Sequence, residues 1–155
     1  MKLILMRHTH ADWAPGQDDH ARPLSPRGRD EARRLGNWLK KSGHLPSHAL
    51  VSDAKRTGQS FAALALSCPA DALAELYLAE PASLRAAINA QRNTDCLLLL
   101  AHNPGIAELA SALVQKCNLF NGLPEQVGRR VPQERLRGVP DLGLARVRVN
   151  VRVGG

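Results

Sequence analysis

Two arginines and two histidines in this sequence could together carry out chemistry on an anionic group. Each follows a short apolar run, either directly or within a few positions: Arg7, His8, Arg56 and His102. A guanidinium offers a fork of N–H donors that matches the oxygens of a phosphate group, and an imidazole can attack phosphorus or hold a charged oxygen. If the fold brings these four side chains together, the set would suit a phosphoryl transfer that needs no metal ion.

Three apolar runs would have to position these residues. Residues 3–6, 49–51 and 96–101 are short and continuously apolar, which is typical of strands buried in a parallel sheet. The carboxyl ends of parallel strands meet at one edge of a sheet, and open α/β sheets bind their ligands at that edge. We therefore expect the arginines and histidines that follow the three runs to lie close together.

Segments with helical periodicity separate these runs. Ser25 and Pro26 have the pattern of an N-cap followed by a proline in the first turn, and they predict a helix over residues 26–41. Asp53 is expected to cap a second helix whose first turn holds Lys55 and Arg56. The inward residues of that second helix are expected to be Ala54, Phe61, Leu64 and Ala65.

The remaining elements continue the alternation of strand and helix. A weaker strand is expected around residues 72–76, a helix is expected to begin at Pro81, and an apolar stripe over residues 106–114 indicates the last helix. Strands that alternate with helices are typical of a three-layer α/β/α fold with a mainly parallel central sheet. The length of the chain fits a single domain over residues 1–155.

The last forty residues have a different character. Residues 117–143 are rich in Gly, Pro and Arg without periodicity, and they are expected to be irregular. Residues 144–153 alternate apolar and mostly basic side chains. This pattern predicts an edge strand whose charged side chains prevent pairing with another strand. The alternative is that this basic stripe binds phosphate or nucleic acid.

Composition narrows the classes of partner. Lys and Arg number 21 against 14 acids, and this formal charge of +7 favours an anionic partner. Aromatic residues make up only 3% of the chain, which argues against the base stacking that readers of single-stranded nucleic acid use. No apolar segment is long enough for a membrane span or fits a signal peptide, so a cytoplasmic protein without membrane contact is expected. The three widely spaced cysteines are expected to be reduced, buried thiols: Cys68, Cys96 and Cys117.

Four short motifs in a fixed order resemble the histidine phosphatase superfamily, which has a phosphoglycerate mutase-like fold. The resemblance is closest to the phosphohistidine phosphatase, or SixA-like, branch, and it extends over residues 1–116. Each motif alone is weak, but the four together in this order make coincidence an unconvincing explanation. They are Met6-Arg7-His8, Arg22-Pro23-Leu24-Ser25-Pro26-Arg27-Gly28, Ser52-Asp53-Ala54-Lys55-Arg56-Thr57 and Ala101-His102-Asn103-Pro104-Gly105.

The resemblance implies a role for each matched residue. His8 would be the nucleophile that becomes phosphorylated, and Arg7 and Arg56 would hold the transferred phosphoryl group. His102 would complete the pocket as a further donor, and Arg22 would support the phosphate end of the site. No metal ion and no other cofactor is implied, because the charges that stabilise the phosphoryl group are supplied by side chains.

The sequence departs from the family pattern at two points. The glycine that usually follows Arg-His is Thr9 here, whose stiffer side chain carries a hydroxyl group. No Glu lies in a motif that matches the glutamate general acid of many superfamily members. Asp19 is the best substitute, with Glu80 second, and either one could equally be a solvated loop acid.

Three interpretations of the function follow from these residues. The preferred one is a metal-independent phosphatase that removes phosphate from a phosphohistidine on a protein, since only the loop over residues 9–24 could cover the site. The alternatives are a phosphatase of small phosphomonoesters and a catalytically weak module that binds phosphate or nucleic acid. A zinc site is a weaker possibility, because its candidate ligands lack the usual spacing: His8, His10, His20 and His102.

Overall fold

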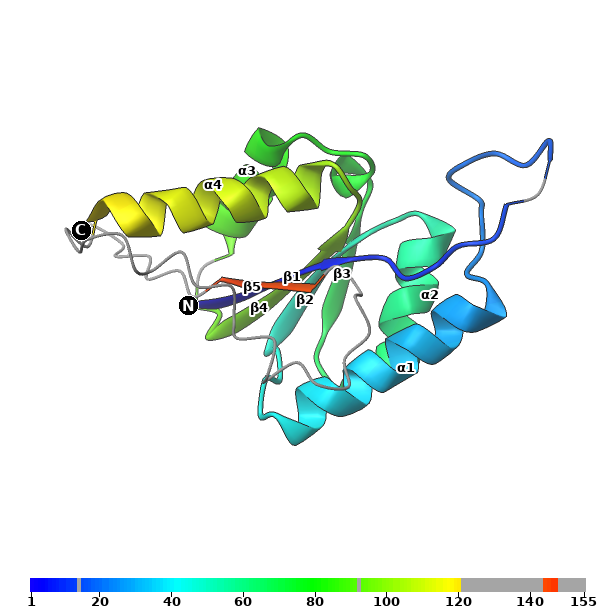
Figure 1. Cartoon of the computed structure of the whole chain (residues 1–155), viewed down its shortest axis with the longest axis horizontal. Coiled ribbons are helices and arrows are strands. Elements are labelled where there is room, and N and C mark those ends of the chain that lie inside the picture. Colours follow the sequence, from blue (N-terminus) through cyan, green and yellow to red (C-terminus); the bar gives the residue numbers. More distant parts are fainter. Residues whose placement is uncertain (14, 92, 121–143, 148–155) are drawn as a thin grey trace.

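The computed structural model describes residues 1–13, 15–91, 93–120 and 144–147, and it contains one five-stranded sheet (Figure 1). The strand order is β3-β2-β4-β1-β5; the first four strands are parallel and β5 is antiparallel to β1. The strands are β1 (Lys2–Arg7), β2 (His48–Ser52), β3 (Ala70–Leu73), β4 (Cys96–Ala101) and β5 (Leu144–Val147). The helices are α1 (Pro26–Lys41), α2 (Lys55–Leu64), the short 3₁₀ helix η1 (Ala74–Leu76), α3 (Pro81–Ala90) and α4 (Gly105–Phe120).

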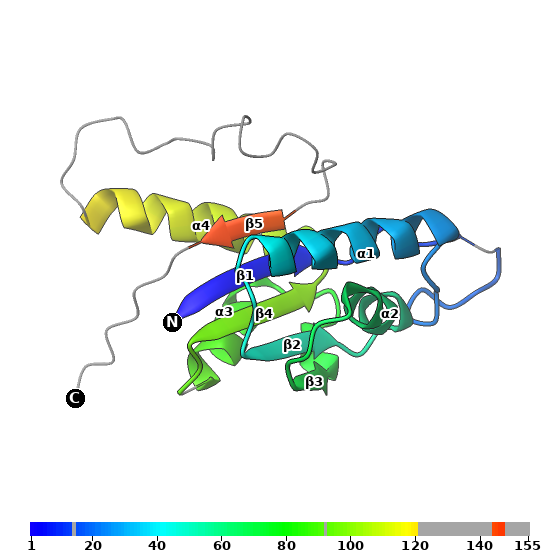
Figure 2. The same ribbon diagram turned by 90° about the horizontal axis from the view of Figure 1, so that it is seen from below.

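Helices cover both faces of the sheet, so the predicted three-layer α/β/α fold with a mainly parallel sheet is confirmed. α3 and α4 lie over one face, and α1 and α2 lie over the other (Figures 1 and 2). Alternate residues of each strand enter the two cores: Leu3 and Leu5 pack with α3 and α4, whereas Ile4 and Met6 pack with α1 and α2. Burial on both faces explains why the central strands are continuously apolar. Each fully buried leucine stabilises the fold by about 1.5–3 kcal/mol.

α1 begins and packs as the sequence predicts. The Ser25 side chain caps the helix by accepting a hydrogen bond from the Gly28 N–H at 3.0 Å, and Pro26 occupies the first turn. Gly36 lies where α1 meets α2, and a Cβ atom at this position would be 2.0 Å from the Leu64 carbonyl oxygen. The glycine therefore permits the close approach of the two helices.

Two local predictions on the second helix were wrong. The N-cap of α2 is Ala54 and not Asp53, whose carboxylate instead accepts a hydrogen bond from His20 Nε2 at 2.8 Å. Ala65 does not point inward, because it ends the helix in a left-handed conformation, with φ of 50°, and is exposed. The short strand also lies earlier than expected: β3 covers Ala70–Leu73, and residues 74–76 form η1.

The end of the chain follows the prediction only in part. α4 extends to Phe120, so the first four residues of the segment that was expected to be irregular, 117–143, are helical. The edge strand is present as β5, next to β1, while residues 121–143 and 148–155 and the side chains of Val114 and Cys117 lie outside the described residues. Of the other two cysteines, Cys96 is buried and Cys68 is partly buried. In the described part of the chain, no helix combines the length and the apolar character that crossing a membrane requires.

Candidate functional site

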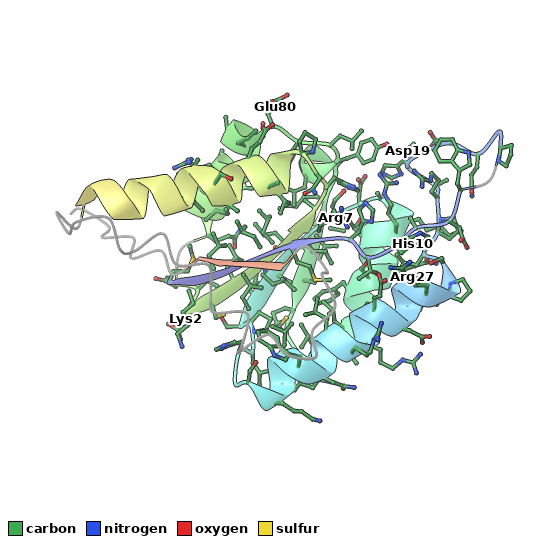
Figure 3. All side chains as sticks on the ribbon, viewed as in Figure 1. Lys2, Arg7, His10, Asp19, Arg27 and Glu80 are labelled. Atoms are coloured by element: carbon green, nitrogen blue, oxygen red, sulfur yellow. The ribbon has the colours of Figure 1, made fainter. Side chains whose placement is uncertain are left out.

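The carboxyl ends of β1 and β4 place two histidines side by side. Arg7 pairs with Ala101 in the parallel ladder, and the His8 N–H continues it with a hydrogen bond of 3.1 Å to the Ala101 carbonyl. The rings of His8 and His102 consequently lie 5.2 Å apart between their centroids. The labelled Arg7 marks this end of the sheet in Figure 3.

Arg56, in the first turn of α2, joins the two histidines. Its Nε donates a hydrogen bond to His8 Nε2, and its Nη2 donates one to His102 Nδ1, both at 3.3 Å. The side chain is buried, with 3% of the residue exposed, although it is charged. The structure therefore brings together three of the four predicted residues around one guanidinium.

His8 is held in one tautomer, with no proton on Nε2, which accepts the hydrogen bond from Arg56. Its Nδ1 lies 2.7 Å from the Thr9 carbonyl oxygen, which can only accept, so the ring proton is on Nδ1. Burial, together with the positive charges of Arg56, Arg7 and Arg22, lowers the pKa of His8 from 6.5 to about 4, against the opposing effect of the Thr9 carbonyl. The imidazole is therefore neutral near pH 7, and its Nε2 is unprotonated, as a nucleophile must be.

His102 is held in the opposite tautomer. Because its Nδ1 accepts from Arg56, the proton is on Nε2, which donates to Ser52 Oγ at 2.9 Å. Burial, together with the charge of Arg56 and the neighbouring His8, lowers the pKa of His102 to about 3. In this state His102 fixes Arg56 and presents no free N–H of its own, in contrast to the further donor that the sequence predicted.

Thr9 uses its hydroxyl group where the family pattern has a glycine. Thr9 Oγ1 donates to the Gly28 carbonyl at 2.8 Å, and the Thr9 N–H donates to Ser60 Oγ at 3.2 Å. The residue is buried, and these bonds tie the end of β1 to α1 and α2. Since its carbonyl also fixes His8, Thr9 holds the orientation of the candidate nucleophile.

Asp19 lies at the site, but as an ionised hydrogen-bond acceptor and not as the general acid that the sequence suggested. Its Oδ2 accepts from Tyr77 Oη at 2.6 Å and from Arg56 Nη2 at 2.9 Å, and its Oδ1 accepts from Arg22 Nη1 at 2.8 Å. The Asp19 carbonyl also accepts from Arg56. Hydrogen bonds from Tyr77, Arg22 and Arg56 hold the pKa of this carboxyl far below its usual range. Asp19 therefore carries no proton that it could donate near neutral pH.

Tyr77 belongs to the site and was missed by the sequence analysis. It follows η1, and its ring packs edge-on against His102, with centroids 5.3 Å apart, while its hydroxyl binds Asp19. The pKa of Tyr77 is raised because the phenol donates to a carboxylate. The sequence offered one signal for this residue, which is that the chain has a single tyrosine. No motif surrounds it.

The structure places the three remaining predicted residues, Arg22, Arg7 and Glu80, in three different settings. Arg22 reaches it through Asp19, and its guanidinium lies 4.5 Å from the centroid of the exposed Trp13 ring. Arg7 is partly exposed, and no hydrogen bond or ion pair with another described residue engages its guanidinium. Glu80, exposed before α3, lies away from Arg7 and Asp19 (Figure 3), so it is not part of the site.

The histidines do not assemble into a metal site within the described residues. His10 Nδ1 bonds Ser25 Oγ at 2.8 Å, and His20 is paired with Asp53 and packs against the Tyr77 ring. Over the described ranges, no group of three or more His, Cys, Asp or Glu side chains could hold a metal ion. The geometry gives no support to the zinc interpretation.

Comparison with known proteins assigns the family. A model of the histidine phosphatase superfamily (branch 1) matches residues 3–104. The chain belongs to this superfamily. An uncharacterized protein of Mycobacterium tuberculosis strain H37Rv is 32% identical over 145 residues, which cover 93% of this chain and 87% of the relative.

Solved structures agree with this assignment. The putative phosphohistidine phosphatase SixA from Nakamurella multipartitia is 35% identical, with a TM-score of 0.70 over 76% of this chain and 68% of that one. A protein histidine phosphatase SixA complexed with tungstate is 30% identical, with a TM-score of 0.67 over 73% of this chain and 76% of that one. The SixA-like branch and the phosphatase class of enzyme, both predicted from the sequence, are confirmed.

Proposed function

We propose that this phosphatase acts on phosphohistidine and works through a phosphohistidine intermediate on His8, without a metal ion. The observation that carries the proposal is the state of His8. Its Nδ1–H is tied to the Thr9 carbonyl, and its neutral Nε2 faces the Arg56 guanidinium. A nucleophile with a fixed lone pair beside a built-in cation has what phosphoryl transfer requires.

The reaction would proceed in two steps. In the first, His8 Nε2 attacks phosphorus, so that a P–N bond forms on His8 while the P–N bond of the substrate breaks, and the departing imidazole takes up a proton from water. In the second, water attacks the phosphorus, releasing inorganic phosphate and restoring neutral His8. Arg56 and Arg7 would bind the phosphoryl oxygens and stabilise their charge in both steps.

The state of Asp19 supports a phosphohistidine substrate. A phosphomonoester releases an alkoxide and gains most from a proton donor, whereas the labile P–N bond of phosphohistidine breaks with less help from a general acid. Three hydrogen-bond donors keep the Asp19 carboxyl ionised, so it cannot serve as that general acid. We assign Asp19 the role of anchoring Arg56 and Arg22 around the phosphoryl group.

Two features of the comparisons are consistent with the proposal. The relative of 35% identity is a putative phosphohistidine phosphatase SixA, and the relative of 30% identity is a protein histidine phosphatase SixA. One of them is complexed with tungstate, which is a tetrahedral oxyanion like phosphate. A pocket organised by Arg7, Arg56 and His8 would bind such an anion, so tungstate should inhibit this enzyme competitively.

The test compares substrates in the presence of a chelator. We expect kcat/KM for a phosphohistidine-bearing protein to exceed that for every member of a panel of small phosphomonoesters, and activity to survive exhaustive treatment with EDTA. A clear preference for a small ester would contradict the proposed substrate. Loss of activity with EDTA and its recovery with zinc or manganese would contradict the metal-independent mechanism.

A further inference from the structure

The outward face of α1 holds the excess positive charge of the first 120 residues. This region contains 14 basic and 11 acidic residues; α1 has six of the basic ones and two of the acidic ones, which leaves eight basic and nine acidic residues for all the rest. The basic residues of α1 form what we call the basic strip: Arg27, Arg29, Arg33, Arg34, Lys40 and Lys41.

Helix geometry turns the whole basic strip toward solvent. The buried side of α1 is marked by Ala32, Leu35 and Leu39, and all six basic residues are exposed on the opposite side. Lys41 lies fourteen positions after Arg27, which corresponds to about 21 Å along the helix axis. The strip is therefore long enough to contact a second protein over several turns.

Nearby acids neutralise only part of the strip. Glu31 is buried and accepts a hydrogen bond from Arg27 Nε at 2.7 Å, and Asp30 is paired with Arg33. No ion pair with another described residue engages Arg29, Arg34 or the two lysines. Residues 121–155 contain seven basic and three acidic residues, so they add to the net positive charge of the chain.

One end of the basic strip adjoins the candidate active site. Arg27 binds Glu31, whose other oxygen accepts a hydrogen bond from the His10 N–H at 3.3 Å, two residues beyond His8. In Figure 3, His10 and Arg27 lie beyond the Arg7 end of β1, on the same side as Asp19, whereas Lys2 lies at the other end of that strand. A protein whose phosphorylated residue enters the site would thus meet the strip next to it.

We infer that the basic strip is the docking surface for an acidic region of the protein that carries the phosphohistidine. This inference rests on the proposed function, and it names the partner of the same site. Charge complementarity of this kind speeds association and selects among partners, while the phosphoryl-binding residues perform the same chemistry on every substrate. Acidic carboxylates within about seven residues of the phosphohistidine could reach along the strip, because an extended chain spans about 3.3 Å per residue.

The test uses two synthetic peptides of equal length, each with one phosphohistidine, whose flanks carry Glu in one and Gln at the same positions in the other. The measured quantity is the ratio of kcat/KM for the Glu peptide to that for the Gln peptide. We expect a ratio of about ten at low salt. At about 0.5 M salt the ratio should approach one, because the Debye length falls to roughly 4 Å.

The double variant R29E/R34E tests the strip directly. Glu at position 29 lies in the first turn of α1, where the helix dipole favours a negative charge. We expect the Glu/Gln ratio to fall to one or below. The matched control K2E/R85E changes the net charge by the same amount outside α1 and should keep the ratio of the unmodified chain. A ratio that is the same in both variants would overturn the docking surface.

Two more measurements distinguish a failure of the proposed function from a failure of the docking surface. Hydrolysis of free phosphohistidine by the unmodified chain tests the proposed function alone, since this substrate cannot reach the strip. Binding of the Glu peptide to the H8A variant, measured by fluorescence anisotropy, tests the docking surface alone. Tighter binding of a short RNA duplex than of the Glu peptide, lost in R29E/R34E, would assign the strip to nucleic acid and overturn the inference.

Discussion

The two ends of the parallel sheet both carry histidines, and the partners of those histidines differ. At the carboxyl end, His8 and His102 share the buried guanidinium of Arg56. At the amino end, His48 at the start of β2 lies 2.9 Å from the exposed carboxylate of Asp71. Burial and the Arg56 cation keep the His8 imidazole neutral, with no proton on Nε2. The Asp71 carboxylate can only accept, so His48 donates its Nε2–H to it. The same residue type therefore suits nucleophilic chemistry at one end only.

The largest expected effect is the loss of His8. His8→Ala should abolish turnover while leaving the fold intact, because the other imidazole at Arg56, that of His102, is bound through both of its nitrogens to Arg56 and Ser52. His48→Ala, at the other end of the sheet, should keep normal kcat/KM. Steady-state kinetics with a phosphohistidine substrate, with circular dichroism as the check on folding, would measure both. Near-normal activity in His8→Ala would contradict the claim that only the histidine at the carboxyl end of the sheet takes part in catalysis.

Replacement of His102 should have the next largest effect. His102→Ala removes the acceptor that orients Arg56, and we expect kcat to fall by about 10²–10³-fold, the loss typical of one preorganised polar group. His102→Asn retains an oxygen that can accept from Arg56, so it should recover part of this loss. An unchanged rate for His102→Ala would place this residue outside the reaction.

Tyr77→Phe should have a small effect. It removes one of the three donors to Asp19 while Arg22 and Arg56 remain, and a net loss of about 1 kcal/mol corresponds to roughly a fivefold fall in kcat/KM. The measurement is a comparison of kcat/KM between this variant and the unmodified chain on the same substrate. A loss as large as that of His102→Ala would mean that the tyrosine contacts the substrate itself.

The pH dependence should be flat where an ordinary histidine titrates. The active form of His8 is neutral and its pKa is about 4, so kcat/KM should be constant between about pH 5 and 7 and should fall only below that range. Both site histidines have lowered pKa values in the folded state, so the unfolded state binds more protons below pH 6.5. The free energy of unfolding should therefore decrease as the pH falls from about 6.5 toward 4. An acid limb of kcat/KM centred near 6.5 would contradict the environment described for His8.

Most of the fold and the centre of the site could be predicted from short-range patterns. The runs over residues 3–6 and 96–101 are buried on both faces, which gives an unambiguous strand signal, and parallel pairing then brings together the residues that follow them. His8, Arg56 and His102 were predicted in this way, because each lies directly beyond a strand or in the first turn of the helix that follows.

The remaining features depend on where loops travel in three dimensions. Tyr77 reaches Asp19 across 58 positions of the sequence, and no local pattern marks that contact. Asp53 has the composition of a helix cap, but His20 from the loop over residues 9–24 competes for its carboxylate. The Asp19 carboxyl is ionised because donors from three separate segments bind it. The sequence alone could therefore suggest a proton donor where the structure has a carboxylate anion.

The phosphoenzyme itself offers the most direct test of the account. The chain would be exposed to a phosphohistidine donor, quenched in base, and analysed by mass spectrometry and ³¹P NMR for the position of the phosphoryl group. Because Nδ1 of His8 is committed to the Thr9 carbonyl, we predict an acid-labile, base-stable phosphate on Nε2 of His8, absent from His8→Ala. Phosphate on Nδ1, on another residue or on no residue under conditions of active turnover would contradict the central claim.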